Sequence, residues 1–412
     1  MPAGPISSPA PTGSRSRRSA APSGSRVPRG VDVLEHAVET VDRDALAAAW
    51  AERRTIVGAW ALSRLLVVAG ALALHWTHAP HGYFGPSIFH RPLGALEAWD
   101  GIWYRLIADH GYLLVAGRQS DPAFFPLYPL LLKVAAATGL PLGVAGIVLS
   151  NLLFLAALLV FDVFGRDVVG PSVARRATIL LAVFPTSYVC SMVYPESLLL
   201  LAFAATGWLA LRRRWVACAV AAALAALARP EGALLVLPIA AAAAARWRDA
   251  DVDERARATA AVLAAPAAAM SFPLYLGWAL HDPLAWTQAQ HAWGRSFRAN
   301  GVFLALTRGA HELGRQAWAG RDIGFCLLTL ALLAVAWRLA VPRMWIALCA
   351  LLVIVPLTSG SFESDARFGL VALPAYWGLA SLVRGRRAFA ALVGVSSALL
   401  LAATLTLPLV FP

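Results

Sequence analysis

The sequence predicts an all-α polytopic membrane protein. Apolar residues make up 59% of the 412 residues, only 14% are charged, and apolar runs recur at a length that a bilayer explains. Inside lipid, backbone N–H and C=O groups find no water, so the spanning segments should be helices. So little polar sequence remains that no separate soluble catalytic domain is expected.

The first 54 residues should form a charged cytoplasmic tail. Residues 1 to about 30 are mostly Pro, Ser, Gly and Arg, which predicts disorder. The first long apolar run begins near Ile56 and is long enough to remain as a span, so no cleavable signal peptide is expected. Arginines ahead of Ile56 place the N-terminus in the cytoplasm, and residues 55–412 form the membrane domain.

Arginine clusters at the ends of apolar runs indicate the cytoplasmic loops. The run at 124–137 contains two prolines and is too short to cross, so it should lie on the outer interface. About eleven spans then remain, at roughly 56–76, 144–164, 177–192, 195–211, 216–228, 231–245, 259–280, 322–338, 344–358, 369–383 and 388–410. This topology leaves two long outer loops, 77–143 and 281–321.

Two charged outer turns should lie below the membrane surface. Roughly 30 residues separate Arg214 from Arg246, which allows only about 22 Å in each direction, so the turn at 229–232 cannot reach the outer surface. The turn at 194–197 is under the same constraint. Charges held at membrane depth indicate a cavity filled with water or lipid headgroups, and they favour a functional role for Glu196, Arg229 and Glu231.

The segment 99–112 reads WDGIWYRLIADHGY and is too polar to cross a bilayer. Trp99, Ile102, Trp103, Leu106 and Ile107 recur at helical spacing, which predicts an interfacial helix in the first outer loop. Asp100 stands in its first turn. It is either a helix cap or a general base for an attacking hydroxyl, and we take the second interpretation as the working hypothesis.

Other residues of the outer loops have simpler interpretations. Arg105 and Asp109 are four apart, which predicts an ion pair on the solvent face, and Asp121 before Pro122 is typical of a turn. Trp99, Trp103 and Tyr104 offer faces on which sugars stack, although aromatic belts at membrane interfaces look the same. Gln290, Trp293 and Arg295 form either a binding triplet or a solvated loop helix.

Several classes of site are disfavoured. The four cysteines have no CxxC spacing and no DxD pair occurs near Asp100, so no cofactor is expected and a divalent metal is not favoured. The net charge of +12 reflects arginines at the ends of spans rather than nucleic-acid binding. Arg295, by contrast, stands in an outer loop against the charge rule, which suggests that it binds an anion such as a lipid phosphate.

A set of motifs resembles a known family. In chain order they are Trp99-Asp100-Gly101 with Trp103-Tyr104, Phe125-Pro126-Leu127-Tyr128-Pro129, Phe184-Pro185-Thr186-Ser187 with Tyr194 and Glu196-Ser197, Arg229-Pro230-Glu231-Gly232, and Gln290 with Trp293-Gly294-Arg295. Together they are similar to the bacterial relatives of the PIG-V mannosyltransferases. Arg367-Phe368 resembles an Arg-Tyr or Arg-His pair that precedes the last spans in the family. Phe368 departs from this pattern, because the family has Tyr or His at that position.

The resemblance implies a GT-C glycosyltransferase with its catalytic aspartate in the first extracytoplasmic loop. Asp100 would be the base, and a polyprenyl-phosphate sugar, usually mannose, would be the donor. Its phosphate would bind Arg229, or Arg295 and Arg367, and transfer would occur at the outer face of the plasma membrane. Substrate contacts are expected at Trp99, Trp103, Tyr104, Tyr128, Tyr194, Glu196, Glu231, Gln290 and Trp293. The acceptor stays open, and the alternatives are a lipid-linked-sugar flippase or an inactive scaffold.

Overall fold

The computed structural model describes residues 43–77, 86–89 and 91–407, and every statement below concerns these ranges. Their regular structure is entirely helical, which confirms the predicted class. Residues 52–412 form one compact unit. Of the predicted tail, 1–54, residues 1–42 lie outside the described residues. Helix α2 (Arg43–Trp76) begins ahead of position 55, the expected start of the membrane domain.

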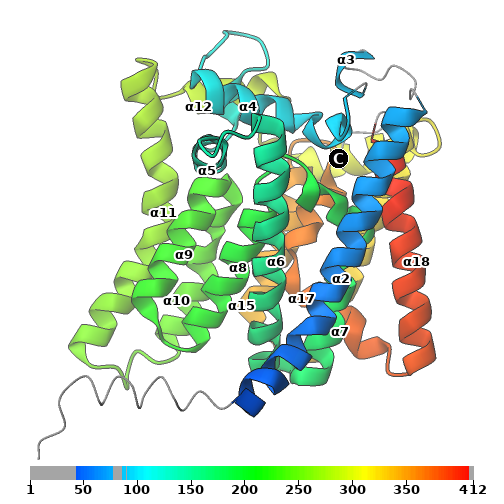
Figure 1. Cartoon of the computed structure of the whole chain (residues 1–412). Coiled ribbons are helices and arrows are strands. Elements are labelled where there is room, and N and C mark those ends of the chain that lie inside the picture. The colour runs from blue at the N-terminus through cyan, green and yellow to red at the C-terminus, as the bar shows by residue number, and fades with distance from the viewer. Residues whose placement is uncertain (1–42, 78–85, 90, 408–412) are drawn as a thin grey trace, which may run out of the picture. The chain divides into compact units, whose positions relative to one another are not determined.

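Five of the predicted spans are confirmed by length and composition. The apolar part of α2 from Arg53 to Trp76 is one. The other four are α6 (Leu142–Val169), α11 (Val252–Ala279), α14 (Ala317–Ala336) and α18 (Arg386–Leu405). Figure 1 shows α2, α6, α11 and α18 running between the same two ends of the bundle. A multi-pass membrane protein follows from these helices.

The other predicted spans are shorter or broken helices, and the count of eleven is not confirmed. They comprise α7 (Pro171–Ala182), η3 (Pro185–Ser191), α8 (Glu196–Leu211), α9 (Trp215–Ala228), η4 (Pro230–Leu235), α10 (Val236–Ala244), α15 (Arg343–Leu357), η5 (Gly369–Val371) and α17 (Leu373–Leu382). A continuous span over 177–192 is wrong. Helix α7 ends at Ala182, and Phe184 is extended because Pro185 follows it. The pair η3 and α8 is bent by 104°, as in a broken span or a re-entrant loop.

A buried arginine of α2 stabilises the broken segment. Arg64 is only 6% exposed, and its guanidinium donates to the carbonyl of Ser187 at 2.9 Å and to the hydroxyls of Ser187 and Ser191 at 3.0 and 2.8 Å. It also lies over the ring of Phe154. These bonds satisfy backbone and hydroxyl groups that a regular helix would have paired internally, which makes a short 3₁₀ segment tolerable at this depth.

Small residues bring the central helices close together. Buried alanines face one another on α9, at Ala222 and Ala225, and on α11, at Ala261 and Ala265. At Gly207 of α8 an added Cβ would lie 2.5 Å from a ring atom of α6, so only glycine fits there. Close backbone approach through small side chains is how helices gain packing contacts where lipid supplies no hydrophobic driving force.

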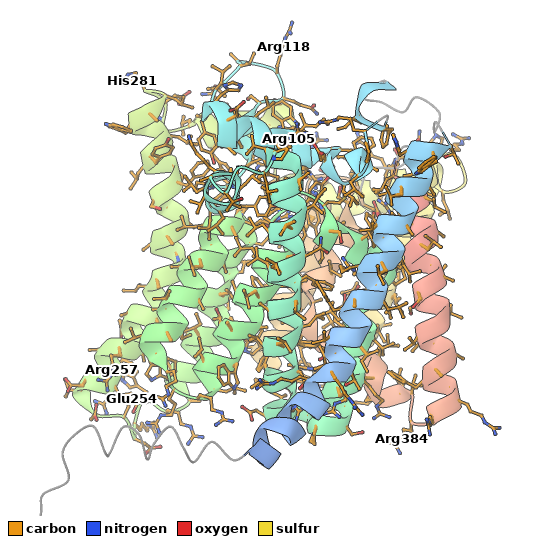
Figure 2. All side chains as sticks on the ribbon, in the orientation of Figure 1. Arg105, Arg118, Glu254, Arg257, His281 and Arg384 are labelled. Atoms are coloured by element: carbon orange, nitrogen blue, oxygen red, sulfur yellow. The ribbon has the colours of Figure 1, made fainter. Side chains whose placement is uncertain are left out.

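Short helices gather at one end of this unit, where α4 (Asp100–His110), α5 (Leu127–Ala136) and α12 (Ala285–Ala292) lie across the ends of the long helices (Figure 1). Both long loops contain further short elements: α3 (Pro86–Phe89), η1 (Gly94–Glu97), η2 (Asp121–Ala123) and α13 (Gly301–Glu312). Figure 2 shows Arg105, Arg118 and His281 at this end and Glu254, Arg257 and Arg384 at the other. Ion pairs link arginines of the predicted cytoplasmic clusters to acidic residues of other segments. Arg212 pairs with Asp167, and Arg213 pairs with Glu254.

Candidate functional site

Asp100 is the first residue of α4, as the sequence suggested. The preceding Trp99 has φ 58° and ψ −127°, an uncommon backbone conformation for a tryptophan. The N–H of Asp100 donates to the hydroxyl of Tyr194 at 3.0 Å, and its Oδ2 accepts from Arg367 at 2.5 Å. The side chain retains 21% exposure. Backbone and carboxylate are therefore both fixed, while part of the carboxylate stays accessible.

Arg367 begins a line of alternating charges that joins three parts of the chain. Its Nε lies 3.5 Å from Oε1 of Glu196, the first residue of α8. The same oxygen accepts from Arg229 at 2.5 Å, and Arg229 makes two further bonds to Glu231, at 3.2 and 2.8 Å. The two charged turns that sequence reasoning placed below the surface thus meet each other, next to Asp100.

Phe368 lies among three cations. Its ring centroid is 5.1 Å from the guanidinium carbon of Arg229, 5.2 Å from that of Arg295 and 5.4 Å from that of Arg367. Each distance is within the range of a cation–π contact. The position that departs from the family pair is therefore an aromatic platform on which all three predicted phosphate ligands converge.

A small pocket lies beside these charges. Its polar walls are Glu196, Arg229, Glu231 and Arg367, and its apolar walls are Leu199, Leu352, Phe368 and Val371. One oxygen of Glu196, Oε2, is buried without a hydrogen-bond partner among the described residues. Burial by itself would lower the pKa of the Arg367 guanidinium, but Asp100 and Glu196 raise that pKa well above its usual range. Arg367 therefore stays a cation at any physiological pH.

The predicted aromatic residues divide into two groups. Tyr104, Tyr128 and Tyr194 are buried, with the rings of Tyr128 and Tyr194 both against Tyr104, so they form the packed support of the site. Trp103 is half-buried and contacts Trp293 edge to face, at 5.4 Å between ring centroids. This pair lies at the more accessible side of α4.

Three residues expected to contact substrate donate hydrogen bonds to backbone carbonyls. The indole N–H of Trp99 donates to the carbonyl of Leu407, and the amide of Gln290 donates to the carbonyl of Ala123. Trp293 likewise donates to the carbonyl of Ser120. Gln290 and Trp293 are thus half-buried on a partly exposed loop helix, α12, that is bonded onto the first outer loop.

The predicted face of α4 needs correction. Tyr104 is buried, whereas Leu106 is 41% exposed. Arg105 does not pair with Asp109. It binds Glu97 at 2.6 Å, because Glu97 ends η1 with its carboxylate buried against Gly143 at the start of α6, whereas Asp109 is exposed beside His110.

Asp121 does form a turn, and its Oδ1 accepts from the N–H of Leu113 at 2.7 Å across the loop.

Sequence reasoning missed several buried charged residues, among them Arg64, Glu97 and Asp322. Arg64 had a visible signal, an arginine inside an apolar run, which is unusual in a span. Asp322 was concealed at the start of another span, beside Arg321. No local sequence pattern marked Glu97 as buried. Its ion-pair partners are Arg91 and Arg105, which the fold brings to either side of it.

Known proteins similar to this chain are mannosyltransferases. Residues 71–291 match the model of the family described as Mannosyltransferase (PIG-V), a range that includes Asp100, Glu196, Arg229 and Glu231 but ends before Arg295 and Arg367. GPI alpha-1,6-mannosyltransferase 2 of Mus musculus is 34% identical over 152 residues, covering 34% of this chain and 30% of that protein. The protein of the same name from Rattus norvegicus is 33% identical over 156 residues, covering 35% and 31%. The match thus spans about a third of each relative.

Among solved structures, ArnT from Cupriavidus metallidurans bound to undecaprenyl phosphate aligns with a TM-score of 0.49 and 17% identity, over 80% of this chain and 62% of that one. The family match is the firmer finding, because it extends over more than half of the 412 residues. It covers the first outer loop, the broken segment and both charged turns. On this basis the chain belongs to the Mannosyltransferase (PIG-V) family.

Proposed function

We propose that this protein transfers a mannosyl residue from a polyprenyl-phosphate donor to a hydroxyl of an acceptor at the extracytoplasmic face of the plasma membrane, with inversion at the anomeric carbon. Family membership supports the reaction class. The single observation that carries the mechanism is the 2.5 Å contact of Asp100 with Arg367, beside a pocket lined by charges of both signs. This arrangement sets a base next to cations that suit a phosphate.

Asp100 is suited to act as the general base. Only its Oδ2 is engaged by a described side chain, so Oδ1 is available to accept the proton of an acceptor hydroxyl. Tyr194 fixes the backbone at Asp100, and Arg367 fixes the carboxylate, so the base keeps one orientation. A base held in place in this way is already oriented for reaction, which lowers the entropic cost of reaching the reactive geometry.

Arg295 is a better phosphate ligand than Arg229. Arg229 already donates three hydrogen bonds to Glu196 and Glu231, so a phosphate would compete with two carboxylates. Within the described part of the chain, the Arg295 side chain makes a single hydrogen bond, at 3.5 Å to the carbonyl of Glu363. Its remaining N–H groups match the fork geometry with which guanidinium groups bind phosphate.

In the proposed step the acceptor oxygen forms a bond to the anomeric carbon as its proton passes to Asp100. The bond from that carbon to the phosphate oxygen breaks, and the electron pair leaves with the lipid phosphate. Arg295 and Arg367 stabilise the charge that develops there. Phosphate is a good leaving group, so no separate general acid is needed, in contrast to glycoside hydrolysis. The proposed step calls for no metal, and persistence of transfer in EDTA would test this.

A lipid-linked-sugar flippase is the competing function. Such a transporter would place polar residues at the bilayer midplane between repeated halves. Here the candidate charges are joined to α4 and the outer-loop elements through Asp100 and Arg367, at the same end of the bundle as α12. This placement favours chemistry at one face. Only an activity assay distinguishes an inactive scaffold from the transferase and from the flippase.

The test is transfer of radiolabelled mannose from polyprenyl-phosphate mannose by purified protein. Asp100→Asn should abolish transfer, because the amide cannot accept the proton. Asp109→Asn is the matched control: it alters an exposed aspartate of the same helix and should leave the rate within about twofold. Unchanged transfer by Asp100→Asn would rule out the base. Movement of the donor across vesicles without transfer would instead indicate the flippase.

A second arm tests the phosphate site. Arg295→Gln should raise the KM for the donor by roughly tenfold or more, since one charge-assisted bond to phosphate is lost. Arg298→Gln, three residues further along and exposed, serves as the control. Equal effects of the two substitutions would show that Arg295 acts only through the general charge of the loop.

A further inference from the structure

A wholly buried carboxylate outside the proposed site bears on its geometry. Asp322 stands in the second turn of α14 and has no exposed surface. Its Oδ1 accepts from Nε of Arg321 at 2.9 Å, and its Oδ2 accepts from the backbone N–H of Ser364 at 2.8 Å. An ionisable group in an apolar span is costly, so it calls for a functional explanation. No step proposed above uses it.

Its partner Ser364 has an uncommon backbone. The residue has φ 67° and ψ 13°, in the left-handed region that favours glycine. Such a conformation persists in a serine only where the surroundings determine it. The bond from its N–H to Asp322 supplies one such constraint, because without it a buried N–H would lose its acceptor.

Ser364 in turn sets the direction of Arg367. It is the N-cap of the single-turn helix α16 (Asp365–Phe368), and its carbonyl accepts from the N–H groups of Arg367 at 3.0 Å and Phe368 at 3.2 Å. From this turn the Arg367 guanidinium reaches Asp100 and Glu196. Both the cation and the aromatic platform of the site therefore depend on one turn, and that turn is bonded to Asp322.

We propose that Asp322 is a positioning residue: by holding the Ser364 turn it sets Arg367 against Asp100. Arg321 extends the same support, since its guanidinium reaches the hydroxyl of Tyr188 on η3 at 3.4 Å. The catalytic consequence rests on the proposed function of Asp100 and Arg367. The structural consequence does not, and the two are measured separately.

The structural arm uses backbone hydrogen exchange on the full-length protein in detergent. Asp322→Ala should raise exchange in a peptide covering residues 361–369 by roughly tenfold or more, with little change in α6 or α11. Asp322→Asn should raise it less, because its remaining oxygen can still accept from Ser364. The matched control is Asp162→Asn, which removes the charge of another buried aspartate, 5% exposed and paired with Arg166 at 2.6 Å on α6.

The proposal would be overturned if a folded Asp322→Ala protein showed unchanged hydrogen exchange in residues 361–369. It would also be overturned if Asp162→Asn raised exchange in the same residues by the same factor. If the alanine variant does not fold, the asparagine variant decides in the same way.

In the activity arm, Asp322→Ala should lower kcat by roughly 10- to 100-fold, the effect of a misplaced catalytic group. It should raise the donor KM by less. If the wild type shows no transfer, the proposed function fails while the exchange result still decides the positioning role. Raised exchange with unchanged kcat would overturn the catalytic consequence alone.

Discussion

Replacing Arg229 with alanine should cost more stability than any other single loss of an arginine pair described above. Arg229 is 13% exposed and bonds Glu196 and Glu231, whose side chains are 2% and 22% exposed. After Arg229→Ala, Glu196 keeps only Arg367, at 3.5 Å, and Glu231 loses both of its bonds. Removing one partner of a buried ion pair costs about 3–5 kcal/mol, because a charge is left buried without compensation.

The matched control has the same geometry in an exposed position. Arg212 makes two bonds of 2.8 Å to Asp167, just as Arg229 makes two to Glu231, but its side chain is 57% exposed. Water solvates the carboxylate that Arg212→Ala leaves behind, so little stability should be lost. The difference between the two substitutions therefore reports burial together with the additional bond from Arg229 to Glu196.

Equilibrium unfolding in mixed detergent and dodecyl sulfate, followed by tryptophan fluorescence, measures both losses. A triple variant, Arg229→Met with Glu196→Gln and Glu231→Gln, should recover part of the stability, because no unpaired charge remains. Similar losses for Arg229→Ala and Arg212→Ala would refute the reasoning. So would a triple variant as unstable as Arg229→Ala.

Two further predictions concern the first outer loop. In Gly143→Ala, the added Cβ would lie 2.2 Å from the carboxyl carbon of Glu97, so the variant should lose about 1–3 kcal/mol in the same unfolding assay. Gly58→Ala has open space around its Cβ and should be neutral or slightly stabilising; equal losses would contradict the close approach. Burial raises the pKa of Asp121 to about 6, so from about pH 4 to 6 the folded protein binds more protons than the unfolded chain and its stability falls as pH rises. Asp121→Asn should flatten that decline in thermal midpoints, and an identical pH profile in the variant would refute it.

The sequence alone determined the features that depend on local chemistry. Apolar runs of bilayer length identified the helices at 56–76, 144–164 and 259–280, because lipid leaves the backbone no other solution there. The charge of the turns at 194–197 and 229–232, together with the short distance available to the chain, predicted that both lie below the outer surface, and in the structure they meet through Glu196 and Arg229. Their motifs also carried the family resemblance that the comparison confirms.

Long-range contacts decided the rest. Where a span is broken, as in η3 and α8, the cost of free backbone groups is offset by Arg64 from a distant helix, which no local pattern shows. Likewise, the pairing of Arg105 with Glu97 rather than Asp109 depends on which carboxylate the fold buries. Asp100 itself is an ordinary first-turn aspartate in the sequence. Its contact with Arg367, 267 positions further along, exists only because tertiary packing brings α16 against α4.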